Sequence, residues 1–597
     1  MRLTFKVVAA GLLTIAGWSL LAFQRNNDTA SEGVRKELVL QADSFLTAVR
    51  RLQTMPVSNN PMLQRRFKEA RLAYKRLEWA AEYFDPLTTR KVNGPPVPET
   101  ELIGQVIQPD GLQVIEELLF PRFRLSSRKQ LTDLLGSLAA NAEEYSDFFK
   151  HADLQDWQIT DAIKQEVFRI EALGLNDFDD PLSRQCFKES TLALGSVQEA
   201  AMRYERETGG RLQELFQQAA RYLSHPVAFN RFNRAEFITA YANPLTQELT
   251  RLHKQLNLPD IRYNRLLNQD AATLFDQGAF NRNAYIDALE DSATTKKIAL
   301  GKKLFYDTRL SGTLTRSCAS CHQPDKAFTD GLVKNLDITG KKRIFRNTPT
   351  LINAALQPAQ FYDLRAASLE DQVGDVVSNR DEMHGNIRLS SQSIWQDKTY
   401  RSLFAGAFPV KDRVAIDTAE IKNALASYIR SLTALNSRFD DFMRGKKGML
   451  SQAEINGFNL FMGKARCATC HYLPLFNSTL PPRYTQMDAE VIGVPKSKSG
   501  KVIDSDPGLL AIRPIEFNRH AFKVTTVRNA ARTAPYMHNG IYKTLDEVID
   551  FYEQGGGAGL GLKVPNQTLA ADRLRLTVKE KKEVVEFIRA LDNHKIP

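Results

Sequence analysis

Cysteine is scarce in this chain, with five residues in 597. Four of them fall in two C-x-x-C-H motifs, which comprise Cys318, Cys321 and His322 in "RSCASCH", and Cys467, Cys470 and His471 in "ARCATCH". Thiols at positions i and i+3 lie on one side of a helical turn, so each can bond to one vinyl group of a porphyrin. The next residue then offers an imidazole to the iron, which is typical of c-type haem.

The two motifs lie too far apart for the usual zinc ribbon. Such ribbons place their C-x-x-C pairs about 15–20 residues apart, whereas Cys467 follows Cys321 by 146 positions. A redox C-x-x-C pair or half of a zinc site is the alternative for either motif alone. We therefore predict two covalently bound haem c groups, and we interpret the fifth cysteine, Cys186, as a small buried side chain.

The chain also lacks any basic tract interleaved with aromatic residues, although its formal net charge is +11. The excess of lysine and arginine is spread over a long chain, which argues against a nucleic-acid partner. The composition, with 43% hydrophobic and 25% charged residues, is ordinary for a soluble globular protein. At about 150 residues per domain, a chain of this length predicts three or four domains.

The N-terminus carries one apolar run, residues 7–23, flanked by Arg2, Lys6 and Arg25. The run is long for the core of an export signal and short for a spanning helix. No A-x-A cleavage site follows it, and no cysteine is present there to take a lipid. Residues 1–25 are thus predicted to be a signal peptide or a retained membrane anchor. Either places the rest of the chain in the periplasm, soluble or held at the inner membrane, where bacteria attach haem covalently.

Strand-like alternation is absent from residues 30–255, where apolar residues recur at three- and four-residue spacing. Leu63, Phe67, Ala70 and Tyr74 form one such stripe. After a linker near residue 260 the helices become shorter, as in cytochrome c domains, where haem supplies much of the core. We therefore predict a mainly α protein. Its domains are a helical bundle over residues 26–258, a first cytochrome c-type haem domain over residues 265–450 and a second over residues 451–597.

Gly111, Gln113 and Glu116 occur in the order G-x-Q-x-x-E within the helical region. This short motif resembles the G-x-H-x-x-E of imelysin-like domains, with glutamine in place of histidine, the better metal ligand. The alternative is a packing or regulatory helical domain in which Glu116 makes a hydrogen bond.

The second half carries further motifs, including "LGKKLFYDTRLSGTLTRSCASCH", "LEDQVGDVVSNRDEMHGN" and "FKVTTVRNAARTAPYMHNGIYKTLDEVIDFYEQGG". In order and spacing they resemble the bacterial dihaem cytochrome c peroxidase family, including its MauG-like branch. The resemblance implies that the first haem reacts with hydrogen peroxide and that the second handles electrons. It also implies that Glu382 is the acid–base group beside peroxide and that Gln372, ten residues earlier, orients the peroxide.

Two departures from the family pattern bear on the first haem. Many members have a histidine after the first motif that caps the iron at rest, but no histidine occurs between His322 and His384. We therefore expect a first haem that is open without prior reduction. The family's tryptophan between the haems is replaced by Tyr362, which keeps an aromatic ring but loses a proton on oxidation. Arg365 in the same stretch is expected to pair with a haem propionate.

The resemblance implies further ligands. Asn347, Thr533 and Pro535 match a structural calcium site between the haems, where oxygen ligands suit a hard cation. Tyr552 is aligned with the distal ligand of the second haem, opposite His471. That ligand is Met in ordinary peroxidases of the family and Tyr in its MauG-like branch. Met537 or His538 is the alternative ligand.

The leading prediction is therefore an exported haem-dependent peroxidase. It would reduce hydrogen peroxide to water with electrons from a small redox protein, a cytochrome c or a cupredoxin. One alternative is a MauG-like oxidase of a protein or organic substrate. Another is a non-enzymatic electron-transfer cytochrome with a helical sensor domain, and the Gln372–Glu382 pair argues against that alternative.

Overall fold

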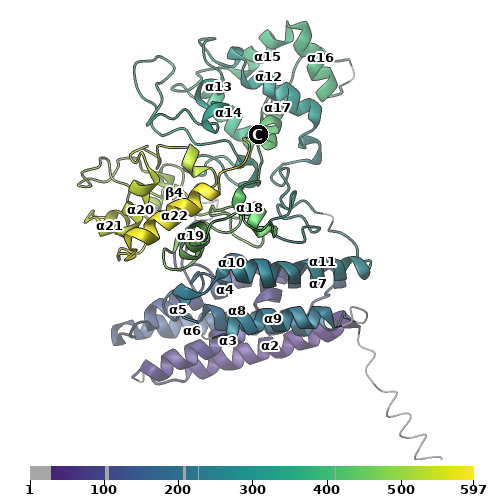
Figure 1. Cartoon of the computed structure of the whole chain (residues 1–597), viewed down its shortest axis with the longest axis vertical. Coiled ribbons are helices and arrows are strands. Elements are labelled where there is room, and N and C mark those ends of the chain that lie inside the picture. Colours follow the sequence, from purple (N-terminus) through teal and green to yellow (C-terminus); the bar gives the residue numbers. More distant parts are fainter. Residues whose placement is uncertain are drawn as a thin grey trace, which may run out of the picture.

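The computed structural model describes residues 29–58, 60–100, 106–205, 210–225, 227–261, 263–410 and 412–596. Within these ranges the chain is mainly α-helical, as the sequence predicts, and it forms three tiers (Figure 1). A layer of N-terminal helices lies at one end, the region of the first haem motif lies at the other, and the region of the second motif lies between them. The predicted signal or anchor, residues 1–25, falls outside the described ranges. None of the helices in the described part is both long enough and apolar enough to span a membrane.

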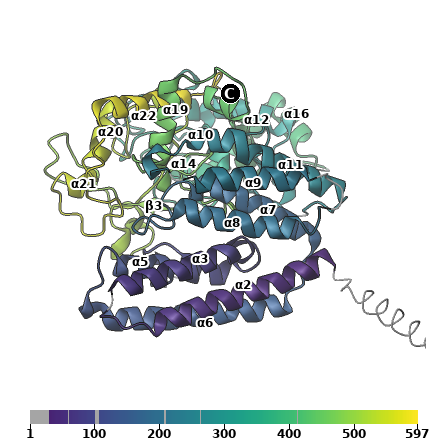
Figure 2. The same ribbon diagram turned by 60° about the horizontal axis from the view of Figure 1, so that its bottom comes forward.

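The N-terminal layer stacks long helices in parallel rows (Figure 2). The predicted apolar stripe of Leu63, Phe67, Ala70 and Tyr74 is buried there, and the Tyr74 ring lies 5.5 Å from that of Phe45. A two-residue strand pair, β1 (Glu99–Thr100) with β2 (Val106–Ile107), is antiparallel. The helices are α2 (Ala30–Gln53), α3 (Asn60–Phe84), α4 (Pro86–Asn93), α5 (Leu112–Leu119), α6 (Arg128–His151), α7 (Asp156–Arg169), α8 (Cys186–Ala201), α9 (Arg211–Ser224), α10 (Arg234–Phe237) and α11 (Asn243–Gln255).

The region of the first motif has a hydrophobic core of its own, centred on two helices that cross closely. Gly301 makes this approach possible, because a Cβ at that position would lie 1.8 Å from the carbonyl oxygen of Ala424. The helices are α12 (Thr295–Phe305), α13 (Cys318–Cys321), α14 (Leu369–Ser378), α15 (Ile387–Trp395), α16 (Lys398–Ala407) and α17 (Thr418–Ser431), of which α12 and α17 form the crossing pair.

The region of the second motif shares one continuous hydrophobic core with the N-terminal layer. The Asn459 side chain accepts hydrogen bonds from the backbone N–H groups of Arg234 and Ala235, at 2.8 and 3.2 Å. The layer is therefore built against this region rather than appended to it. Its elements are α18 (Arg438–Met443), α19 (Gln452–Met462), α20 (Leu545–Glu553), α21 (Gly556–Gly559), α22 (Val578–Ala590) and the antiparallel pair of β3 (Ala489–Glu490) and β4 (Phe522–Lys523).

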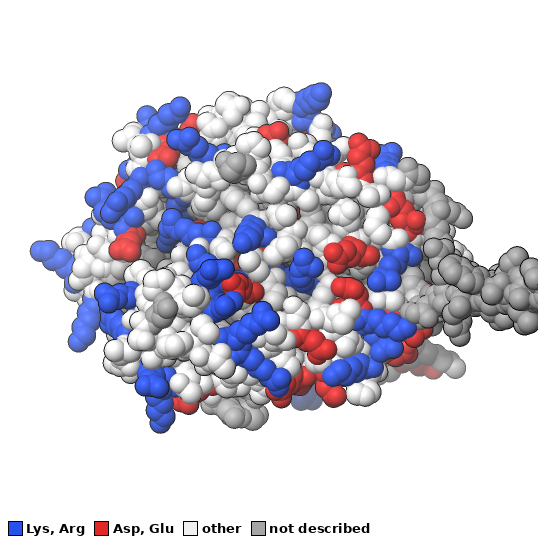
Figure 3. Space-filling model, turned by 90° about the horizontal axis from the view of Figure 1, so that it is seen from below, with Lys and Arg blue, Asp and Glu red and all other residues white. Residues whose placement is uncertain are grey.

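Charges of both signs are interspersed on the face that the N-terminal layer presents at the bottom of Figure 1. Figure 3 shows this face, on which lysine and arginine alternate with aspartate and glutamate. The positive net charge therefore does not gather into a single basic surface on this side of the described residues.

Candidate active site

The first C-x-x-C-H motif forms one turn of helix, α13, that ends at its histidine. The Ser317 side chain caps the turn, together with Ser320. The Nδ1 atom of His322 lies 3.0 Å from the carbonyl oxygen of Phe328. If Nδ1 carries the proton and donates it to this carbonyl, Nε2 is left as the nitrogen that can bind a metal. Burial lowers the pKa of His322, which keeps the imidazole neutral as a ligand must be.

The second motif repeats this arrangement. The Nδ1 atom of His471 lies 3.2 Å from the carbonyl oxygen of Phe476, and burial lowers the pKa of the ring to about 4. The thiols of Cys467 and Cys470 are free, and burial raises the pKa of Cys467 to about 12. Each motif thus offers two unpaired thiols and one oriented, neutral imidazole on a single turn. These groups are the ones that c-type haem needs, so the residues present fit that cofactor.

Glu382 lies beside the first motif although 60 residues separate it from His322 in the sequence. Its backbone carbonyl accepts a hydrogen bond of 3.2 Å from Arg316, two residues before Cys318, and its charge contributes to the raised pKa of Cys321. Burial raises the pKa of the Glu382 carboxyl, and the nearby Arg365 opposes this only in part. The carboxyl accepts a 2.8 Å hydrogen bond from Asn379.

Gln372 lies on α14, the helix that precedes the loop of Glu382. Its Oε1 atom is buried and has no hydrogen-bond partner among the described residues. A buried acceptor without a partner costs about 1–3 kcal/mol. This acceptor is therefore available to a small polar ligand such as peroxide.

Arg365 and Tyr362 occupy the stretch between the two motifs. Arg365 bonds to both carboxylate oxygens of Asp363 at 3.0 Å, and its guanidinium lies 3.5 Å from the centre of the Phe361 ring. Burial raises the pKa of the Tyr362 phenol, and its carbonyl accepts a 2.7 Å bond from the backbone N–H of Lys523 on β4. Tyr362 therefore joins the first region to the second. The propionate partner expected for Arg365 stays a prediction.

Tyr552 lies on α20. Burial is the largest cause that raises the pKa of its phenol, and the charges of Cys470 and Cys467 are the next largest. His538 is engaged elsewhere: its ring stacks on Phe522 at 3.8 Å, and its Nε2 atom lies 3.3 Å from Asp504. The distal ligand of the second haem, Tyr552 or its alternatives Met537 and His538, stays a prediction.

Similar proteins share the second half of the chain. A family model described as di-haem cytochrome c peroxidase matches residues 295–448. The cytochrome-c peroxidase IdrP2 of Denitromonas iodatirespirans is 32% identical over 313 residues, which cover 49% of this chain and 81% of that protein. The chain belongs to the di-haem cytochrome c peroxidase family. It is a haem-dependent peroxidase with two haem c groups.

Other proteins similar to this di-haem peroxidase are named MauG or MauG-like. The methylamine utilization protein MauG of Methylorubrum extorquens is 33% identical over 298 residues, covering 50% of this chain and 78% of that protein. A crystal structure of a MauG-like protein associated with microbial copper homeostasis aligns with a TM-score of 0.46 and 29% identity, covering 52% of this chain and 95% of that one.

Covalent attachment of both haems makes a direct prediction. A variant with Cys467→Ala and Cys470→Ala should retain one haem per chain after acidic acetone extraction, and the unaltered peroxidase should retain two. The matched control is Cys186→Ala, which removes the one cysteine outside the motifs and should leave both haems attached. Iron and haem content per chain is the measurement. Zinc in place of iron, or no retained haem, would contradict the assignment.

The residues expected to hold calcium come from segments that meet. The backbone N–H of Asn347 donates to the carbonyl of His538 at 2.7 Å, and its side chain donates to Leu332 at 2.8 Å. Asn347 therefore lies against the segment that carries Thr533 and Pro535. A calcium ion bound by these three residues stays a prediction for this peroxidase.

The G-x-Q-x-x-E motif of the N-terminal layer ties α5 to its neighbours. Gly111 has φ of +89°, and a Cβ there would lie 2.4 Å from the carbonyl oxygen of Val92. The Gln113 amide donates to the Asn93 carbonyl at 3.0 Å, and the Glu116 carboxylate accepts from the backbone N–H of Ser183 at 2.6 Å. Both side chains are thus engaged with the backbone.

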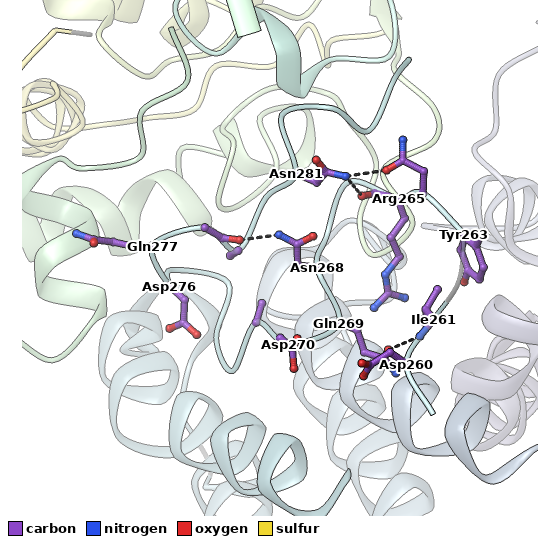
Figure 4. A pocket seen from close by; sticks show the side chains of 14 residues that line it. Asp260, Ile261, Tyr263, Arg265, Asn268, Gln269, Asp270, Asp276, Gln277 and Asn281 are labelled. Carbon is purple, nitrogen blue, oxygen red and sulfur yellow. Dashed lines mark hydrogen bonds between the residues drawn. The ribbon is translucent and has the colours of Figure 1, made fainter. Parts of the chain in front are cut away.

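A polar pocket of about 390 Å³ opens in the linker that follows α11, away from both motifs. Figure 4 shows the side chains of Arg265, Asn268 and Gln269 around it. Arg265 is already paired with both carboxylate oxygens of Asp161, at 2.7 and 2.9 Å. No residue of the predicted peroxidase site lines this pocket.

Sequence reasoning missed a buried ion pair that supports the second motif. Arg528 donates to both carboxylate oxygens of Asp440 on α18, at 2.9 and 2.8 Å, and to the carbonyl of Pro474 at 2.8 Å. It thereby anchors the loop whose Phe476 carbonyl lies against His471. No local sequence pattern predicts this ion pair, because the two residues are 88 positions apart.

Proposed function

We propose that this peroxidase reduces hydrogen peroxide to water at the haem attached to Cys318 and Cys321, with His322 as the proximal ligand. The placement of Glu382 carries the proposal, because a largely buried carboxyl with a raised pKa lies beside the first motif. Haem c, when bound, supplies the iron that takes up peroxide and the electrons that split its O–O bond.

Gln372 and Glu382 have separate roles in this reaction. The free Oε1 atom of Gln372 accepts a hydrogen bond from peroxide and so orients it. Glu382 takes the proton from the inner peroxide oxygen and returns it to the outer oxygen, which leaves as water. Overall, one peroxide takes up two electrons and two protons and yields two water molecules.

A resting-state spectrum tests this proposal. The loop of residues 331–350 contains no histidine, so nothing of that type caps the first iron. The ferric protein should show one high-spin haem, five-coordinate or water-bound, that reacts with peroxide without prior reduction. Electron paramagnetic resonance and optical spectra before and after peroxide provide the measurement. Two low-spin haems, with a lag in turnover that added reductant abolishes, would overturn the proposal.

Cys467, Cys470 and His471 would hold the second haem, which would supply electrons to this site. The proposed donor is a small redox protein of the periplasm, a cytochrome c or a cupredoxin. A calcium ion on Asn347, Thr533 and Pro535 would stabilise the junction between the two haem regions.

Tyr552 favours a second candidate function, the oxidation of a protein or organic substrate by a MauG-like route. A phenolate oxygen stabilises ferric iron, whereas a thioether favours ferrous iron and raises the reduction potential. Tyr552 near the thiols of the second motif would therefore suit a haem that shares an oxidising equivalent rather than one that only relays electrons.

A pair of substitutions separates the two candidates. Tyr552→Phe should leave both haems attached but change the low-spin spectrum and the reduction potential of one haem only. Met537→Leu, the matched control at the alternative ligand, should change neither. Spectroelectrochemical titration of both variants gives the measurement. The opposite pattern would make Met537 the ligand and would weaken the MauG-like candidate.

A further inference from the structure

The N-terminal layer buries many charged side chains, and several of the basic ones are paired with carboxylates. Arg71 donates to both carboxylate oxygens of Glu189, at 2.7 and 2.8 Å. Lys75 and Arg169 both bond to Asp179, at 2.6 and 3.0 Å. These pairs neutralise their acidic partners but leave other buried carboxylates of the same layer without a cation of their own.

Asp177, Asp180 and Cys186 lie close together in the same layer. They lie in or just after the loop that follows a π-helical turn at Ile170–Gly174. One ligand atom from each of the three lies within 4.8 Å of the other two. Their exposed fractions are only 5%, 0% and 6%.

Two further observations point to a missing ligand there. The Oδ1 atoms of Asp177 and Asp180 are buried and have no hydrogen-bond partner among the described residues. A small cavity of about 10 Å³ borders Asp180 and Cys186, and Lys75 and Arg169 also line it, whereas Asp177 does not. A space of this size holds about one water molecule or one bare ion.

The three side chains are acidic groups, as ligands of a metal cation are. With the thiol ionised, as a metal ligand is, Asp177, Asp180 and Cys186 carry three negative charges. Arg234 is the basic group common to Asp177 and Cys186, and its Nε and Nη1 atoms donate to the carbonyls of Leu175 and Phe232. Arg184 and Arg466 also act on Asp177, and Arg71 acts on Asp180, so positive charge around the cluster offsets part of its negative charge.

We propose that Asp177, Asp180 and Cys186 bind a divalent transition-metal ion of the zinc class. A thiolate disfavours calcium and magnesium, which take oxygen ligands, whereas two carboxylates and a thiolate suit zinc. With metal–ligand distances of about 2.0–2.3 Å, tetrahedral zinc brings its ligand atoms to about 3.5 Å from one another. The three side chains therefore draw together slightly when the ion enters.

The site adjoins the second haem motif. Asn176, next to Asp177, donates to the carbonyl of Ala468 between the two motif cysteines, at 3.0 Å. The Phe178 ring lies edge-on to Tyr472 with centroids 5.4 Å apart. An ion on Asp177 and Asp180 would thus tie down the loop against which this motif packs.

Zinc binding by the intact dihaem protein tests the proposal. In that protein the four motif cysteines are bonded to haem, so Cys186 is the one free thiol of the chain. After chelation and reloading, we expect one tightly held Zn²⁺ for every two irons. X-ray absorption at the zinc edge should show one sulfur at about 2.3 Å. A zinc shell without sulfur, or no stoichiometric binding, would overturn the proposal.

Variants identify the residues. Cys186→Ser should abolish the sulfur signal and weaken zinc binding by at least tenfold, and Asp180→Asn should weaken it similarly. Asp147→Asn removes an exposed carboxylate of the same layer and should bind as the unaltered protein does. Haem content and circular dichroism check that each variant folds. If Asp180→Asn fails that check, the zinc-edge spectrum of the unaltered protein decides the matter. Unchanged binding by folded Cys186→Ser would overturn the proposal.

Discussion

Glu382→Gln is expected to lower peroxide turnover by about 10²-fold or more, the usual scale for an acid–base group, while both haems stay attached. Glutamine keeps an oxygen that can accept the hydrogen bond from Asn379, so the loop should hold its conformation. It cannot take or return a proton. Steady-state turnover with peroxide and a reduced donor, set against haem content, gives the measurement.

Asp381→Asn is the matched control for this change. Asp381 precedes Glu382 and is exposed, and it raises the pKa of Glu382 less than burial does. Turnover should therefore stay close to normal in this variant. Near-normal turnover in Glu382→Gln as well would mean that the proton is moved by another group and that the proposed distal side is misplaced.

Arg528→Met is expected to destabilise the region of the second motif by about 3–5 kcal/mol, the usual result of removing one partner of a buried ion pair. The side chains of Arg528 and Asp440 are 1% and 2% exposed, so the remaining carboxylate would have neither a cation nor water. The bond to the carbonyl of Pro474 would also be lost. Hydrogen exchange of peptides from α18 and from residues 472–478 measures the local opening free energy.

Two comparisons separate the buried charge from other effects. Adding Asp440→Asn to Arg528→Met should recover part of the loss, because the stranded charge is removed. Arg519→Met breaks the exposed pair with Glu516, whose side chains are 46% and 76% exposed, and should cost less than about 1 kcal/mol. Equal losses from Arg519→Met and Arg528→Met would contradict the assigned role of burial.

The destabilisation caused by Arg528→Met should depend on pH and should be smaller at low pH. Burial disfavours the charged form of Asp440, but Arg528 and the hydrogen bonds from Ser437 together outweigh burial and lower the pKa of this carboxyl below its ordinary value. The stabilisation is therefore complete above the unfolded pKa and is lost as the pH falls through the folded one. The difference in local opening free energy between the unaltered protein and Arg528→Met should become smaller below about pH 4.

The haem motifs could be recognised in the sequence because the residues of each motif that bind haem lie within a few positions of one another. Cys318, Cys321 and His322 occupy one turn, so spacing alone places two thiols and an imidazole together. The helices of the N-terminal layer could be predicted for a similar reason, since the apolar stripe that begins at Leu63 buries one face of a long helix. Periodicity and motif spacing act within a few residues and need no knowledge of the partner element.

Long-range neighbours had to come from the fold or from family resemblance. Resemblance pointed to Glu382 and Tyr552, and the structure places each near a motif thiol, at Cys321 and at Cys470. Their roles as acid–base group and distal ligand stay predictions. Neither periodicity nor spacing could have supplied these neighbours, because each depends on how α14 and α20 pack against segments far away in the chain.

The sequence by itself determined the cofactor chemistry and the mainly helical fold, and the predicted division into a helical region and two haem regions stays a prediction. Only the tertiary structure decided that the helical layer packs against the second motif, through Asn176 and Asn459. It also decided that Arg528 finds Asp440, and that Cys186 is buried beside two unpaired carboxylates. The physical reason is that a buried charge or amide needs a hydrogen-bond or ion-pair partner, and tertiary packing brings that partner close. The residues next to it in the sequence do not indicate which partner this is.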